Sequence, residues 1–479
     1  MNEKKVFVIT FPLISHLNSI LNVINELVQT YHVNVITYGL KKHEHLVLST
    51  GSEFRAYENF NGLDLSEINA KKTGIEILAP LMQNLLTLTN MNLIKIACEI
   101  DKEKPDLILF DIMSLHAKWV IRFLEKNNKR FLKNVNSFVL TRSPPPKIAI
   151  YSTGFANQRN VFPDNTDVRI LYTAPLRAKY CSYLSILKAI IRTKMLSIKY
   201  GIDFIVPLDE MFVNNTNNKH IVFTIPEIQP KASFLHKNIK YIGPCLNENL
   251  RTNEQRLTRD TQIDLKKMIE KFKPINPTHS YDQLMNGDND RLFYVSFGTV
   301  FASGSEAFLK IIDAINMFNG QSIEELNKKG IKINKLNAIM SVGKSCYDEL
   351  NKIFKLANHS LLEEIVIAPS APQIEILKRA SLFLTHTGFG SMHESLYLGV
   401  PMIAMPISAD QPLNTRYLEK DLKACVSVDF RHSNSIEIKN AIERILIDQS
   451  YHKQCLTYSR LLKDCNGAKN GAELINTLF

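Results

Sequence analysis

The feature that most constrains the fold is a strand–helix–strand pattern in the first 40 residues. Residues 6–10 form an uninterrupted apolar run, as a strand buried on both faces requires. Apolar residues then recur every three or four positions from Leu17 to Leu27, and a second strand-like run follows at residues 33–37. A strand, a helix and a strand in this order form a βαβ unit with parallel strands. The chain is therefore predicted to be an α/β protein.

The same alternation returns later in the chain. A strand at residues 106–110 leads into a helix from Ser114, and the second half opens with a strand at residues 292–297. Further strands are predicted at residues 338–342, 364–367, 382–385 and 402–405, with helices between them.

The length and the turn signals divide the chain into two domains. A chain of 479 residues exceeds what one hydrophobic core usually holds. We predict a first Rossmann-like domain over residues 1–245, a polar, turn-rich linker over 246–290 and a second Rossmann-like domain over 291–479. Two facing doubly wound domains would leave an interdomain cleft at the carboxyl ends of their strands, where ligands bind in such folds.

Composition excludes several classes of function. The net charge is +11, but the basic residues are scattered and form no arginine-rich tract, so binding to nucleic acid is not indicated. Seven widely spaced cysteines without a C-x-x-C pair favour neither a disulfide framework nor a zinc site, and they fit a reducing compartment. The apolar start is interrupted by Pro12, His16 and Asn18, and no apolar run approaches membrane-spanning length. We expect a cytoplasmic protein with no metal and no transmembrane segment.

Two stretches of the first half are less regular. Residues 144–163 begin with three prolines and lose periodicity, so we predict a loop. Residues 171–205 are helical in pattern and rich in lysine and arginine. Such a stretch can rest on a membrane surface, but we favour an ordinary helix pair with a solvated face, and nothing further in the sequence supports peripheral membrane contact.

The most informative segment is residues 380–401, where an apolar strand ends at Thr385 and a glycine-bearing turn leads into a helix near Ser391. Free backbone amides at a helix start, such as those of Gly390 and Ser391, form a natural seat for phosphate. His386 can donate a hydrogen bond to the same group, and Glu394, one turn into the helix, can accept both hydroxyls of a ribose. A glycine turn of this kind also serves for tight packing alone, so the segment by itself does not decide the function.

A wider set of residues resembles the signature box of the UDP-glycosyltransferases, enzymes of the GT-B superfamily that glycosylate small lipophilic acceptors. Its members are Gln373 with the preceding Pro372, Gly388, Ser391, Glu394, Gly399-Val400-Pro401, Pro406, Asp410-Gln411 and Asn414. Residues 294–299 also resemble the strand and loop that open the family's C-terminal domain.

The resemblance implies a UDP-sugar donor site in the second domain. Ser296, Thr299, His386, Ser391 and the amide of Gly390, beside Gly388, would hold the diphosphate, and Glu394 would hold the ribose. Gln373 and the Ala371 backbone would frame the uracil, and Asp410 and Gln411 would bind hydroxyls of the transferred sugar. Ser370 stands where the family usually places a uracil-stacking aromatic ring, so donor affinity or base preference is expected to differ. The last helix would pack back on the N-terminal domain.

A histidine and an aspartate are the candidate catalytic pair. His16 follows the first strand in a loop and Asp111 ends another, so two strand ends of one parallel sheet can bring them together. A histidine suits removal of a proton from a hydroxyl near neutral pH, and a carboxylate can fix its tautomer. The loop of residues 12–19 resembles the family loop that carries the base, although Ser15 and Ser19 replace its usual glycine and proline.

The resemblance implies an inverting transfer of a hexose from a UDP-sugar to a hydroxyl of a small lipophilic acceptor, without a cofactor. Gln411, and an apparent lack of a signal peptide and membrane anchor, favour glucose and a soluble enzyme. A UDP-sugar epimerase of the same fold and a catalytically silent UDP-sugar-binding scaffold are the alternatives. The acceptor itself has no diagnostic motif, and its pocket is expected from residues roughly 55–90 and 140–205.

Overall fold

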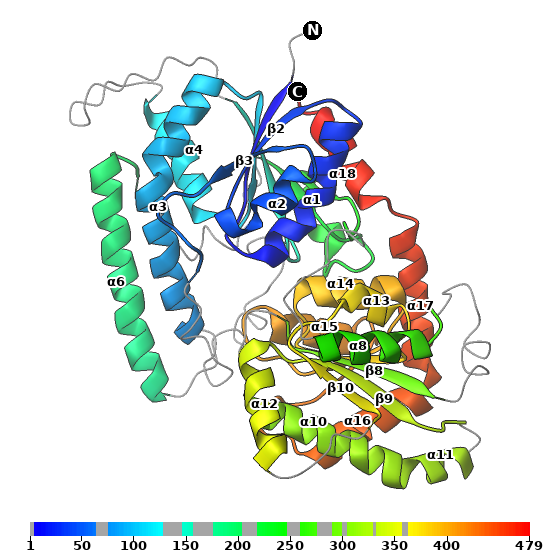
Figure 1. Cartoon of the computed structure of the whole chain (residues 1–479). Coiled ribbons are helices and arrows are strands. Elements are labelled where there is room, and N and C mark those ends of the chain that lie inside the picture. The colour runs from blue at the N-terminus through cyan, green and yellow to red at the C-terminus, as the bar shows by residue number, and fades with distance from the viewer. Residues whose placement is uncertain are drawn as a thin grey trace. The chain divides into compact units, whose positions relative to one another are not determined.

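The protein is represented by a computed structural model that describes residues 4–63, 75–127, 146–156, 176–203, 218–246, 259–274, 290–298, 304–328, 332–356 and 363–479. These residues form two compact units (Figure 1). The first contains the elements from β1 to β7 together with α18, and the second contains those from α8 to α17.

The first unit is built on a seven-stranded parallel sheet with the strand order β3-β2-β1-β4-β5-β6-β7. β1 pairs with β2 on one side and β4 on the other, so that Val6 lies beside Val35 and Leu107. The central strands are buried on both faces, which explains their continuous apolar runs. The strands are β1 (Lys5–Ile9), β2 (Asn34–Gly39), β3 (Glu53–Ala56), β4 (Leu107–Asp111), β5 (Lys147–Ser152), β6 (Lys219–Val222) and β7 (Ile239–Tyr241).

The helices of the first unit include one from the far end of the sequence. Helix α18 (Gly467–Asn476) packs on α1 (Ile14–Gln29). The approach is close at Gly471, where an added Cβ would lie 2.9 Å from Ile242 and 3.0 Å from Val23. The other described helices are α2 (Glu44–Leu48), α3 (Ile75–Glu103), α4 (Leu115–Asn127) and α6 (Leu176–Tyr200), with the short 3₁₀ turns η1 (Lys41–His43) and η2 (Ala232–Phe234).

The second unit has a six-stranded parallel sheet with the order β10-β9-β8-β11-β12-β13. Counted along this unit, the order is 3-2-1-4-5-6, the Rossmann arrangement, with its switch point between β8 and β11. The predicted α/β class with two doubly wound parallel sheets is therefore confirmed. The strands are β8 (Arg291–Ser296), β9 (Leu336–Ser341), β10 (Ile365–Ala368), β11 (Leu382–Thr385), β12 (Met402–Ala404) and β13 (Cys425–Ser427).

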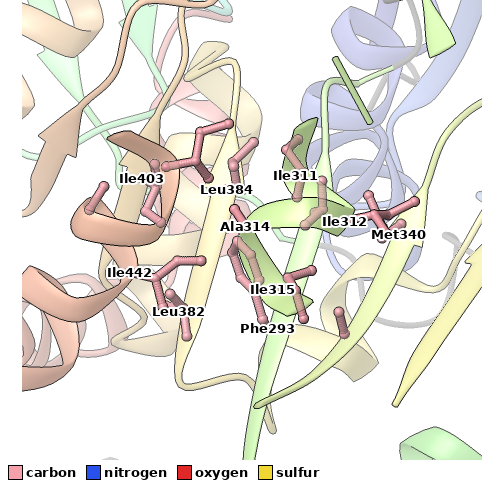
Figure 2. Packing of buried hydrophobic residues seen from close by; sticks show 14 of the residues in the cluster. Phe293, Ile311, Ile312, Ala314, Ile315, Met340, Leu382, Leu384, Ile403 and Ile442 are labelled. Carbon is pink, nitrogen blue, oxygen red and sulfur yellow. The ribbon is translucent and has the colours of Figure 1, made fainter. Parts of the chain in front are cut away.

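A buried aliphatic cluster joins the second sheet to its helices. Figure 2 shows Ile311 and Ile315 of α10 packed near Phe293 and Leu384 of the sheet, with Ile442 of α16 beside them. The described helices of this unit are α8 (Arg259–Lys271), α10 (Ser305–Met317), η3 (Phe318–Ser322), α11 (Ile323–Lys328), α12 (Lys344–Leu356), α13 (Gln373–Leu377), α14 (Phe389–Leu398), α15 (Gln411–Lys420), α16 (Ser435–Ile447) and α17 (Gln449–Lys463).

Three details of the sequence prediction need correction. The stretch 144–163, predicted as a loop, contains β5, which begins at Lys147 directly after the prolines. The basic stretch 171–205 contains one helix, α6, in place of the predicted pair. His16 lies in the first turn of α1, because that helix already begins at Ile14.

The remaining differences concern short elements. Strands β3, β6, β7 and β13 were not predicted, since each is short and mixes apolar with polar or charged residues. Residues 246–290, expected as a linker, include α8, which packs beside β10 in the second unit. Among the described residues, no helix combines the length and apolar character needed to cross a bilayer.

Candidate active site

His16 and Asp111 meet at the carboxyl end of the first sheet. Nδ1 of His16 lies 2.9 Å from Oδ2 of Asp111, and the carboxylate is fully buried. The other carboxylate oxygen accepts a hydrogen bond of 2.8 Å from the backbone N–H of Met113. Phe11 lies against the imidazole with the ring centroids 4.6 Å apart. The first turn of α1 and the end of β4 therefore hold the imidazole and its carboxylate partner in one orientation.

Thr153 is a third member of this group that the sequence did not reveal. It follows β5, which pairs with β4, and its Oγ1 lies 2.7 Å from the same Nδ1 of His16. An ionised Asp111 favours the tautomer with hydrogen on Nδ1, which places Thr153 as a second acceptor for that hydrogen. This tautomer leaves Nε2 with the lone pair that a general base needs.

Two buried tyrosines surround the carboxylate. Burial raises the pKa of Tyr57 and of Tyr151 well above the usual range, and the charge of Asp111 raises both further. Tyr57 donates to the carbonyl of Thr10 and contacts Nε2 of His116, whose pKa burial lowers to about 3. These side chains stay neutral at physiological pH, so they add no charge to the surroundings of His16.

In the second unit, the helix that follows β11 begins where the sequence predicted a phosphate seat. Gly388 is the N-cap of α14, and no side chain caps the helix start. The first intrahelical bond is donated by the amide of Met392 to Gly388, so the amides of Phe389, Gly390 and Ser391 precede the helical ladder. Such amides, with the positive end of the helix dipole, favour an anion.

His386 lies against two glycines beside this helix start. A Cβ at Gly298 would be 2.7 Å from Cε1 of His386, and a Cβ at Gly388 would be 2.6 Å from its Nε2. Any side chain at either position would displace the imidazole. Burial lowers the pKa of His386 to about 4, so the ring is neutral at pH 7 and can donate a hydrogen bond but supplies no positive charge.

Gln373, Ser391 and Glu394 form one hydrogen-bonded cluster. The side-chain amide of Gln373 donates to Oε2 of the buried Glu394 and lies 3.4 Å from Oγ of Ser391. Its carbonyl oxygen accepts from the hydroxyl of Tyr294 at 3.4 Å. Gln373 therefore orients the predicted ribose-binding carboxylate in this structure.

Asp410 and Gln411 differ in their environment. Asp410 is exposed and accepts a 2.8 Å hydrogen bond from Asn414. Gln411 is buried, and its side-chain oxygen accepts from the amides of Ile407 and Ser408. That oxygen is occupied by the backbone, so Gln411 has its side-chain N–H₂ group to offer a sugar hydroxyl.

Thr387 connects this loop to the helix start and was not singled out from the sequence. Its φ of 59° is unusual for a β-branched residue and marks a strained backbone next to His386. Its hydroxyl bonds to Thr415 at 2.6 Å, and its carbonyl accepts from Asn414 at 2.9 Å. No sequence signal identifies this conformation, because threonine rarely adopts it.

The other predicted donor residues lie on neighbouring loops or outside the described residues. Ser296 ends β8 beside β11, and its Oγ accepts from the amide of Gly298. Ser370 is buried and Ala371 half-buried just before α13. Thr299 is outside the described residues. In the described part of the chain, no group of three or more His, Cys, Asp or Glu side chains is arranged to hold a metal ion.

The comparison with protein families agrees with this geometry. The family model for UDP-glucoronosyl and UDP-glucosyl transferases matches residues 346–466, which include β11, α14 and the Asp410-Gln411 pair. A relative from Bacillus subtilis, the uncharacterized UDP-glucosyltransferase YojK, is 23% identical over 98% of this chain and 96% of its own length. Human UDP-glucuronosyltransferase 2B7 is 36% identical over 95 residues, 19% of this chain and 18% of that protein.

Solved structures establish the fold over the whole length. The glycosyltransferase of kitacinnamycin superposes with a TM-score of 0.69 at 17% identity and full coverage of both chains. The calicheamicin glycosyltransferase CalG4 has a TM-score of 0.66 at 15% identity, covering 100% of this chain and 98% of its own. These structural matches show the GT-B fold. The family model and the curated relatives together support a member of the UDP-glycosyltransferase family, a UDP-dependent glycosyltransferase.

Proposed function

We propose that the protein is an inverting glucosyltransferase that moves glucose from UDP-glucose to a hydroxyl of a small lipophilic acceptor. The observation that carries the proposal is the 2.9 Å contact between His16 and the buried Asp111. A positioned base of this kind is what a hydroxyl nucleophile requires near neutral pH.

The acceptor hydroxyl would lose its proton to Nε2 of His16 as its oxygen attacks the anomeric carbon. The proton then resides on an imidazolium whose Nδ1–H faces the Asp111 carboxylate, which stabilises the new charge. The bond from the anomeric carbon to the diphosphate oxygen breaks in the same step, and UDP leaves. A single displacement inverts the anomeric configuration.

The departing diphosphate would be stabilised by the start of α14. The amides of Phe389, Gly390 and Ser391 and the helix dipole supply the favourable potential, and neutral His386 adds one hydrogen bond. With these donors the proposed step needs neither metal nor cofactor.

Support for glucose comes from the position of Gln411 in the box and from the name of the Bacillus relative that spans nearly the full chain. The glucuronosyltransferase match covers only 95 residues, so its donor has less bearing on this chain. For the compartment, the buried thiols of Cys346, Cys425 and Cys455 fit the reducing cytoplasm that we propose.

The test is a mass-spectrometric assay of the purified protein with UDP-glucose, UDP-galactose and UDP-glucuronate against a mixed panel of phenols, sterols and macrolides. We expect a hexose adduct with UDP-glucose, and NMR of the product should show a β-linkage from the α-configured donor. Retention of configuration would reject the single displacement.

His16→Ala and Asp111→Asn test the base. We expect each to lower kcat by about 10²- to 10⁴-fold while UDP binding is retained. His432→Ala removes an exposed histidine of the second unit and serves as the matched control. Near-wild-type turnover of a folded His16→Ala variant would reject the assignment, and epimerised UDP-sugar without acceptor would favour an epimerase.

A further inference from the structure

Helix α6 carries an apolar stripe on its exposed side. The stripe consists of six large apolar residues, each of which is between 37% and 72% exposed. Most neighbours in this set are three or four positions apart, so they lie along one side of the helix. The members of the stripe are Leu184, Leu187, Ile190, Ile191, Met195 and Ile198.

The opposite side of α6 fixes the helix to its unit. Ala189, Leu196 and Tyr200 are buried in the core of the first unit, and α6 runs alongside α3 (Figure 1). Arg192 donates to the hydroxyl of Thr87 and to the carbonyl of Gln83 on α3. The stripe is therefore held outward by a well-packed helix.

The charge of α6 is of one sign only. The helix sequence contains no aspartate or glutamate. At 3.6 residues per turn, exposed Lys188 and Lys199 lie along one edge of the stripe, and exposed Lys194 lies near the other edge, between Leu187 and Ile190. Lys199 also bonds to Asn90 at its end of the helix. The six basic residues of the helix are Arg177, Lys179, Lys188, Arg192, Lys194 and Lys199.

An apolar strip edged by lysines fits the surface of an anionic bilayer. The aliphatic side chains can enter the boundary between headgroups and acyl chains, while the lysines extend to lipid phosphates. A protein partner is less suited to this pattern, since lysine is depleted from protein–protein interfaces. We propose that α6 docks the enzyme on membranes that contain anionic lipids. This proposal is independent of the sugar that is transferred.

The experiment is co-sedimentation of the full chain with vesicles of equal parts phosphatidylcholine and phosphatidylglycerol, compared with phosphatidylcholine alone. We expect binding to the anionic vesicles only, and release as salt is raised from about 0.1 to about 0.5 M. The triple variant Ile191→Ser, Met195→Ser, Ile198→Ser should reduce binding by at least about tenfold, because three exposed aliphatic groups are lost. The double variant Lys188→Glu, Lys194→Glu should do the same.

A matched control replaces three exposed aliphatic residues elsewhere: Leu48→Ser, Leu356→Ser and Ile436→Ser. It should bind vesicles as the wild type does, and thermal unfolding of all variants should be unchanged. Failure of the wild type to bind anionic vesicles, or equal loss in the control, would overturn the proposal. A wild-type dimer in sedimentation analysis that the stripe variant converts to a monomer, without vesicle binding, would overturn it too and identify a second copy as the occupant.

Discussion

The hydroxyl of Thr153 and the carboxylate of Asp111 approach the same nitrogen of His16. Both contacts fix the ring from its Nδ1 side, and the order of the strands, not the sequence around each residue, brings the three together. Thr153 acts through His16 and is a positioning residue.

Thr153→Val removes this second acceptor with little change in side-chain volume. We expect kcat to fall by about tenfold, as for the loss of a neighbour that orients a functional histidine. KM for the UDP-sugar should not change. Thr153→Ser should restore kcat. Identical kinetics for Thr153→Val and wild type would show that Asp111 alone orients the ring.

At the scale of elements, the position of His386 beside the start of α14 depends on Gly388, which has no side chain. Gly388→Ala is compatible with the helical N-cap backbone but places a Cβ where Nε2 of His386 lies. We expect UDP affinity to fall by roughly tenfold as the imidazole moves and one hydrogen bond is lost. Isothermal titration calorimetry with UDP measures this affinity.

The matched control is Gly304→Ala at the N-cap of α10, where an added Cβ meets nothing within 4 Å. Its UDP affinity should equal that of the wild type. Unchanged binding by a folded Gly388→Ala variant would exclude His386 from the phosphate site.

A substitution on helix α10 can test the packing against the second sheet. Ile315 is fully buried in the cluster of Figure 2. Ile315→Ala should lower the free energy of unfolding by about 2–5 kcal/mol, since it removes apolar contacts and leaves a cavity. Ile436→Ala, at a side chain 53% exposed on α16, should change it by less than about 0.5 kcal/mol. Denaturant titrations of both variants measure whether the loss in free energy of unfolding depends on burial of the side chain.

The elements that sequence could predict are the long or strongly apolar ones. β1, β8 and β11 are continuous apolar runs because both faces of each strand are buried. β5 was not predicted because three prolines precede it. Without this strand, Thr153 could not be assigned to the site. The left-handed backbone of Thr387 was also beyond prediction, since its partners Asn414 and Thr415 become neighbours only after folding.

At the scale of the whole molecule, buried histidines make the fold sensitive to acid. Burial lowers the pKa of His116 to about 3 and of His393 and His452 to about 4. In the unfolded chain these rings take up protons near pH 6.5, whereas in the folded protein they do so only near pH 3–4. The buried neutral histidines therefore make their full contribution to the free energy of unfolding above pH 6.5. This contribution falls as the pH drops toward 4.

Each such histidine contributes a slope of about 1.4 kcal/mol per pH unit within this window. We expect the free energy of unfolding, measured by denaturant titration between pH 7 and 4.5, to fall steeply over a range in which most carboxylates are still ionised. His116→Gln should flatten the curve. His432→Gln, at an exposed ring, should leave its slope unchanged. A flat wild-type curve would show that these rings take up protons equally in the folded and unfolded chain.

The return of α18 to the first unit has a consequence for biosynthesis. The ribosome completes β7, the last strand of the first sheet, more than 200 residues before it reaches Gly467. At typical elongation rates this interval is roughly 10 to 45 seconds. Throughout it, the face of α1 around Val23 that receives Gly471 stays uncovered on the nascent chain. The unit that begins first is thus among the last to finish, and its early-made surface must avoid aggregation until the final helix emerges.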